Sequence, residues 1–305
     1  MKIEKLTPAF KDYVWGGNKL KEKYQKNTRI TPCAESWELS AHPDGFSTLP
    51  DGRTLLEAFD KNDFGVRAAR FDVFPMLIKF IDAASDLSVQ VHPSDEYAAI
   101  HEKSLGKSEL WYVVEADEGA GLYVGFKKKI TKAEYEQAIK NDTLCSLLNF
   151  FEVKAGDFYF IPAGTVHAIG RGCLICEIQQ NSNVTYRVYD HGRVGKDGKP
   201  RELHIAKALD VSSTEPYIPA ACQTADEKGG ILLSSCDYFE SRLYKIDEKQ
   251  AIKLDKNSFR AISCVEGKGF VGELPARAGD TFFVGACDGE LAVSGKLALI
   301  VSFVP

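Results

Sequence analysis

The sequence has no long hydrophobic run and no excess of basic residues. No stretch approaches the ~20 consecutive apolar residues that a membrane helix needs. The first residues, 1–8, show no apolar segment of the kind found in secretion signals. The formal net charge is -5 at pH 7, which disfavours binding to nucleic acid or to an anionic membrane. We therefore expect a cytoplasmic protein that binds neither.

The sequence also lacks a regular cysteine spacing of the kind found in disulfide-rich proteins, and it lacks histidines after residue 204. The eight cysteines are scattered along the chain, and we expect them to be free thiols in a reducing compartment. Cys173 and Cys176 lie in an apolar run, where positions i and i+3 of a strand face opposite sides, so they are read as buried thiols. No histidine follows His204. Metal chemistry that uses histidine therefore belongs to the earlier part of the chain.

Short runs rich in Val, Ile, Tyr and Phe dominate the sequence and predict a mainly β fold with a few short helices. One helix is predicted over 131–151, where Thr131 and Glu134 form a capping-box pattern, and a short one is predicted to begin near Ser94. Residues 211–230 are rich in Pro, Ser, Thr and Gly and are interpreted as a linker. We predict two domains, a metal-binding domain at 1–215 and a second β domain at 216–305.

Four residues have the character of a metal site. Gln90 and His92 are two positions apart in an apolar strand-like run, so their side chains point to the same face. Glu109 opens a second such run, and His167 follows a tight turn at the end of a third. Two imidazoles, a carboxylate and an amide oxygen suit a divalent ion such as zinc that keeps a position open for substrate.

The segment that ends in His167 has a recognisable pattern. Gly156, Pro162, Gly164 and His167 fit G-x5-P-x-G-x2-H, which resembles the second motif of the cupin superfamily, a jelly-roll β-barrel. The segment GDTFFVGA at 279–286 echoes GDFYFIPA earlier in the chain. The resemblance implies two cupin-like jelly-roll β-barrel domains, of which the second is degenerate.

Further segments narrow the resemblance to one family. SVQVHP at 88–93 with Lys107 and Glu109, YVWGG at 13–17, AESWELSAHP at 34–43 and the run from Glu177 to Arg187 together resemble type I mannose-6-phosphate isomerases. One position departs from the pattern of longer relatives, which carry H-K-P-E where this chain has Gly106-Lys-Ser-Glu109. No histidine at 106 is therefore available for proton transfer.

The family resemblance implies one Zn²⁺ per chain, held by Gln90, His92, Glu109 and His167. It also implies a phosphosugar substrate whose aldose and ketose forms interconvert by proton transfer between C1 and C2 through a cis-enediol. Such a reaction needs an electrophile, an acid or base, and a clamp on the distant phosphate. We expect a monomer or homodimer.

The remaining site residues are assigned partly from the resemblance and partly from their setting. Arg187 and Lys107 are the predicted catalytic residues. Lys79 lies in an apolar strand-like run, and a buried lysine needs a partner that the site can supply. Ser88 shares a strand face with Gln90. Lys79, Ser88 and Glu177 are therefore predicted to bind substrate.

Three alternatives stay open. A cupin dioxygenase that uses iron would have three histidines and a glutamate, so Gln90 disfavours it. A non-catalytic sugar-binding cupin predicts damaged ligands, whereas all four are present in the first copy. An isomerase of another phosphosugar would use the same residues.

Overall fold

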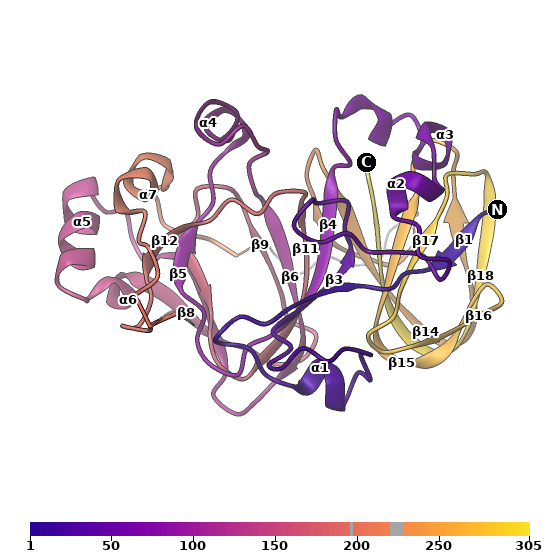
Figure 1. Ribbon diagram of the computed structural model, residues 1–305, viewed down its shortest axis with the longest axis horizontal. Helices are drawn as coiled ribbons and strands as arrows, with labels where there is room; N and C mark the ends of the chain where they lie inside the picture. Colours follow the sequence, from indigo (N-terminus) through magenta and orange to yellow (C-terminus); the bar gives the residue numbers. More distant parts are fainter. Residues whose placement is uncertain (196–197, 220–228) are drawn as a thin grey trace.

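The computed structural model describes residues 1–195, 198–219 and 229–305. The fold is mainly β, as predicted, with three antiparallel sheets and a few short helices (Figure 1). Part of the predicted linker, residues 220–228, lies outside the described residues. None of the helices in the described ranges is long and apolar enough to cross a membrane. All seven cysteines that the structure describes are free thiols.

A six-stranded sheet lies at the centre of the molecule. Its strands, in order, are β2 (Ala9–Lys11), β3 (Glu35–Leu39), β4 (Met76–Asp82), β11 (Cys173–Gln180), β6 (Glu109–Ala116) and β9 (Phe158–Ile161). Its middle strands are buried on both faces, because one face contacts a five-stranded sheet and the other a seven-stranded sheet. This explains why their sequences are nearly continuous apolar runs.

The five-stranded sheet faces it. Its order is β12 (Tyr186–Tyr189), β5 (Val89–Val91), β10 (His167–Ile169), β7 (Gly121–Phe126) and β8 (Leu148–Glu152). Trp111 and Ile175 of one sheet pack with Leu122 and Ile169 of the other in a shared core. Each sheet ends at its own edge strands, so the expected jelly-roll pair does not close into a barrel in the part of the chain that is described.

Three helices cover the outer face of the five-stranded sheet, at the left of Figure 1: α5 (Lys132–Lys140), α6 (Leu144–Leu147) and α7 (Ile205–Val211). The predicted helix over 131–151 is wrong in its second half. Its start is confirmed, since the side chains of Thr131 and Glu134 form the capping box. The helix stops because Asp142 adopts a left-handed conformation, with φ of 55°. The chain after Leu147 then pairs with β7 as strand β8.

The other helices are short. They are α1 (Lys19–Glu22), α2 (Leu55–Ala58), α3 (Lys61–Phe64), the 3₁₀ turn η1 (Ala68–Arg70) and α4 (Asp95–His101). Helix α4 begins after Ser94, as predicted, because the Ser94 hydroxyl accepts a hydrogen bond from the backbone N–H of Tyr97.

The third sheet contains most of the C-terminal segment. It has the order β1 (Ile3–Lys5), β17 (Thr281–Val284), β15 (Arg260–Val271), β18 (Gly289–Phe303), β14 (Glu240–Leu254) and β13 (Ile231–Ser235), with β16 (Leu274–Arg277) beside β15. Residues of one face, such as Leu243 and Ile300, pack against Phe80 and Cys176 of the six-stranded sheet. Strand β1, near the other end of the sequence, joins this sheet by pairing with β17. The predicted boundary between two domains at residue 215 stays a prediction.

Candidate metal centre and cavity

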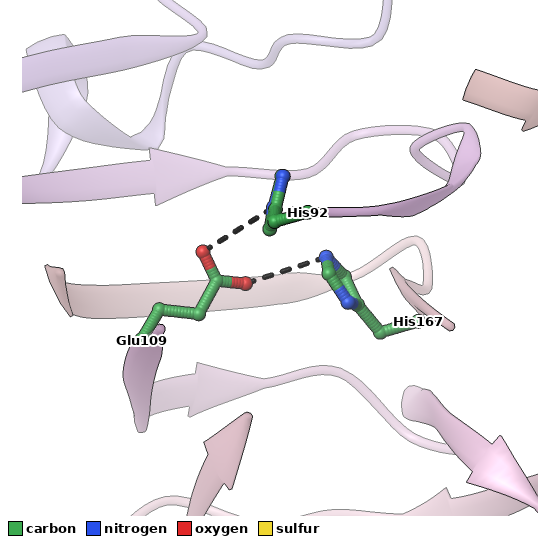
Figure 2. A group of neighbouring side chains, drawn as sticks. All are labelled: His92, Glu109 and His167. Carbon is green, nitrogen blue, oxygen red and sulfur yellow. Dashed lines mark ion pairs between the residues drawn. The ribbon is translucent and has the colours of Figure 1, made fainter. Parts of the chain in front are cut away.

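His92, Glu109 and His167 form a buried cluster between the two facing sheets (Figure 2). Glu109 opens β6, His167 opens β10 and His92 follows β5. The Glu109 carboxylate lies between the imidazoles, with Oε2 3.5 Å from Nε2 of His92 and Oε1 3.4 Å from Nε2 of His167. The three side chains thus place a ligand atom each within 4.8 Å of one another.

The outer ring nitrogens fix the tautomers of both histidines. Nδ1 of His92 lies 2.8 Å from the carbonyl oxygen of Val184, and Nδ1 of His167 lies 2.8 Å from that of Thr165. A carbonyl only accepts, so each Nδ1 carries the hydrogen and each Nε2 presents a lone pair toward Glu109. Hydrogen bonds of this kind orient histidine ligands in metal sites.

Protonation and hydrogen bonding also favour a cation at this place. Burial, reinforced by the nearby Lys107 ammonium, lowers the pKa of His167 to about 3 and lowers that of His92 well below its ordinary value, so both rings are neutral at pH 7. Oε1 of Glu109 and Nε2 of His167 have no hydrogen-bond partner among the described residues. Buried polar atoms without partners are costly, and a divalent ion would satisfy both.

Gln90 is placed beside this cluster by strand register. It lies directly opposite His167 on one side and Arg187 on the other, so the three residues form a row across β10, β5 and β12. Neighbours in such a row have side chains on the same face. This arrangement is compatible with the predicted ligand role of Gln90, which stays a prediction.

A cavity of about 260 Å³ adjoins the cluster. The predicted residues Lys79, Ser88, Gln90, Lys107, Glu177 and Arg187 line it, together with residues such as Tyr13, Trp15, Glu35 and Arg201. The structure therefore brings every predicted non-ligand residue to the wall of one cavity. Their individual roles stay predictions.

Charges of alternating sign run along the buried wall of the cavity. Nζ of Lys79 lies 3.8 Å from Glu35 and 3.5 Å from Glu177, while Nζ of Lys107 lies 3.6 Å from Glu177 and 2.5 Å from Glu109. Burial opposes ionisation of Glu177, but Lys107 and Lys79 outweigh it and lower its pKa. Lys79, which was predicted to need a partner, thus has a carboxylate on each side, and Lys107 lies between Glu177 and Glu109.

Arg187 faces the cavity without a carboxylate partner among the residues described. Its Nε donates to the Ser88 hydroxyl at 3.3 Å and its Nη1 to the backbone carbonyl of Glu202 at 2.9 Å. Burial and the nearby Arg201 guanidinium lower its pKa. A half-buried cation with a second cation close by favours an anionic ligand at this end of the cavity.

Two charged residues of the cavity wall were not assigned from the sequence, Glu35 and Arg201. Glu35 lies inside the segment 34–43, two positions before Trp37, and this spacing places both side chains on one face of a strand. The structure agrees, because Nε1 of Trp37 donates to Glu35 at 2.6 Å. Arg201 had no such signal. It reaches the site because its guanidinium pairs with Asp190, with Nε 2.6 Å from Oδ2.

Glycine at position 106 also has a structural reason. A Cβ there would lie 2.6 Å from the backbone nitrogen of Asp95 and 2.7 Å from the carbonyl oxygen of Pro93. The backbone approach at the start of α4 leaves no room for a histidine side chain at this position.

Comparison with known proteins agrees with the family resemblance found in the sequence. Residues 3–119 match the phosphomannose isomerase type I catalytic domain, and residues 231–304 match the cupin domain of mannose-6-phosphate isomerase. The mannose-6-phosphate isomerase ManA of Bacillus subtilis is 38% identical over 97% of this chain and 96% of its own length. That of Streptococcus mutans is 44% identical over 65% of this chain and 64% of its own.

Structural comparison extends the match to the whole fold. The crystal structure of a mannose 6-phosphate isomerase from Bacillus subtilis superposes with a TM-score of 0.89, at 34% identity and with 99% of each chain covered. Similarity of this extent in sequence and structure shows that the chain belongs to the type I mannose-6-phosphate isomerase family.

Proposed function

We propose that this chain interconverts mannose 6-phosphate and fructose 6-phosphate with one Zn²⁺ per chain. The observation that carries the proposal is the cluster of His92, Glu109 and His167 beside a cavity that contains Arg187. The relatives that match over their full length are named mannose-6-phosphate isomerases, which supports mannose 6-phosphate as the substrate. We expect the protein to act in the cytoplasm as a monomer or homodimer.

The residues present fit a zinc ion. Gln90, His92, Glu109 and His167 would hold it, because two imidazole nitrogens, a carboxylate and an amide oxygen are suitable donors. The ion would also satisfy the partnerless Glu109 Oε1 and His167 Nε2. When bound, it supplies Lewis-acid polarisation of a substrate oxygen.

Lys107 and Arg187 are the proposed catalytic cations. A base on the cavity wall would take the proton from the carbon beside the carbonyl, and negative charge would develop on the carbonyl oxygen, at C1 in the aldose and at C2 in the ketose. Return of the proton to the other carbon of the cis-enediol completes the isomerisation. Lys107 lies at the cluster end of the cavity, with Nζ 3.2 Å from Nε2 of His92, and would stabilise that charge. Arg187 faces the same space from the opposite sheet, held by Ser88.

The other cavity residues would bind and orient the sugar. Ser88 and Lys79 offer hydrogen-bond donors, and Glu177 offers a carboxylate for hydroxyl groups. The substrate phosphate would be bound by Arg201, which lines the cavity close to Arg187. Anchoring the phosphate there would hold C1 and C2 in place for proton transfer.

A coupled assay tests the proposal. Purified protein is given mannose 6-phosphate, and fructose 6-phosphate is followed with and without EDTA, before and after zinc is restored. We expect turnover that EDTA removes and zinc restores. No turnover of mannose 6-phosphate with zinc fully loaded would refute the assignment. Turnover of another aldose phosphate would then identify an isomerase of a different phosphosugar. Binding of the sugar without turnover would indicate a sugar-binding cupin.

A further inference from the structure

A second cavity lies on the seven-stranded sheet and shares no lining residue with the first. It has a volume of about 840 Å³ and is lined by residues of the segment after α1 and of strands β14, β15, β16 and β18. Five cations line it, namely Lys23, Lys245, Lys268, Arg277 and Lys296. The carboxylates on its wall are Asp247 and Glu266. The chain as a whole has a net charge of -5, so this local excess of positive charge opposes the overall balance.

Strand register places three of these cations side by side. Lys268 of β15 lies directly opposite Lys296 of β18 on one side and Arg277 of β16 on the other. Residues opposite each other in antiparallel strands point to the same face, and like charges in such a row destabilise a sheet. The row is therefore an arrangement that an anion would relieve.

Asp247 of β14 lies directly opposite Lys296, so the row contains three cations and one carboxylate and keeps a net positive charge. Among the residues that the structure describes, Lys268 and Lys296 take part in no ion pair. Arg277 donates from its guanidinium to the side chain of Gln25, a neutral group. Lys23, by contrast, is paired with Glu115 at 2.7 Å and forms a fixed wall of the cavity.

We propose that this cavity binds a small anion that carries phosphate groups, with Lys268, Lys296 and Arg277 as its contacts. Adjacent strands are about 4.8 Å apart, so the three long side chains can converge on one or two phosphate groups. Leu297, Ala298 and Ala278 add apolar surface beside the cations, which suits an organic group attached to the phosphate. The site is separate from the proposed active site and does not depend on its chemistry.

Calorimetric titration of the full chain tests the proposal. The probes are sodium pyrophosphate and uridine diphosphate, added to wild type and to the double variant Lys268→Gln/Lys296→Gln. The matched control is Lys128→Gln/Lys132→Gln, which removes the same charge from exposed positions elsewhere. We expect binding of pyrophosphate to weaken about tenfold in the first variant, as when charge-assisted contacts are lost, and to be unchanged in the control.

Thermal unfolding at low ionic strength gives a second measurement. Without ligand, Lys268→Gln/Lys296→Gln should unfold at a higher temperature than the control variant, because the repulsion in the row is gone. Pyrophosphate should raise the unfolding temperature of wild type more than that of Lys268→Gln/Lys296→Gln. Tighter binding of uridine diphosphate would identify a nucleotide ligand, and equal binding a ligand recognised by phosphate alone. Equal pyrophosphate binding by all three proteins would overturn the proposal, since any binding would then lie at another site.

Discussion

Lys79 and Glu177 lie directly opposite each other on β4 and β11, with Nζ 3.5 Å from Oε1, in the interior of the protein. A tryptophan flanks each of them in the same cross-strand row. The Trp37 ring lies 4.8 Å from Nζ of Lys79, and Nε1 of Trp111 donates to Glu177 at 2.9 Å. The row holds two opposite charges in fixed positions beside the cavity.

The first prediction concerns this pair. Lys79→Met leaves the Glu177 carboxylate buried with one cation fewer, which should lower the free energy of unfolding by about 3 kcal/mol. Urea denaturation of the metal-free protein measures the loss. The double variant Lys79→Met/Glu177→Gln removes both charges and should regain part of the stability, because Glu35, 3.8 Å from Nζ of Lys79, still loses a cation. If Lys79→Met were as stable as wild type, Lys79 would not stabilise the buried Glu177 carboxylate.

The second prediction concerns the metal. Glu109→Gln removes the charge between the two imidazoles while keeping the size of the side chain. Metal affinity should fall by more than the roughly 10–100-fold typical of residues that only position a ligand, and activity should fall with it. Metal analysis after dialysis measures occupancy, with Glu152→Gln, an exposed position, as the control. Full occupancy in Glu109→Gln would contradict its assignment as a ligand.

The third prediction separates catalysis from metal binding. Arg187→Ala should retain zinc, since no metal-ligand contact of Arg187 is expected, but should lower kcat/KM about 100-fold, the loss typical of one charge-stabilising donor. Steady-state kinetics and metal analysis on the same preparation measure both. Arg171→Ala, which removes an exposed arginine, is the matched control and should behave like wild type. Unchanged kcat/KM in Arg187→Ala would remove this residue from the mechanism.

The fourth prediction tests the close approach at Gly106. Gly106→Ala places a methyl group 2.6 Å from the backbone of Asp95, and we expect a loss of about 1–3 kcal/mol in the free energy of unfolding, as for other overpacked positions. Gly285→Ala is the control, because its added Cβ meets only ordinary contacts at 3.5 Å or more. Equal unfolding midpoints for the two variants would show that the start of α4 shifts easily.

Local patterns in the sequence predicted the elements around the metal cluster well. Alternation in SVQVHP puts Gln90 and His92 on one face, and the turn before His167 directs that residue inward, so periodicity and turn chemistry were sufficient there. The capping box at Thr131 correctly marked a helix start. These features depend on neighbours in sequence, which is why they could be read without a structure.

Features that depend on distant contacts were missed. The helix predicted over 131–151 was too long, because pairing with β7 outweighs helical preference after Leu147. Arg201 reaches the cavity through its contact with Asp190, and no local pattern marks it. The cation row of Lys268, Lys296 and Arg277 exists only through the register of three strands.

The pairing of β1 with β17 determines when one edge of the C-terminal sheet can form during synthesis. Ile3 lies opposite Val284, and Lys5 reaches Asp280 at 2.6 Å, so one edge of the C-terminal sheet is filled by a strand that lies about 275 residues earlier in the sequence. During synthesis, β1 therefore has no partner on this sheet until β17 has been translated. A fragment of residues 216–305 produced alone would expose unpaired backbone groups along one side of β17. Such an edge strand can pair with other chains, so the fragment should aggregate. A peptide of residues 1–8 added in trans should cap that strand and keep the fragment in solution.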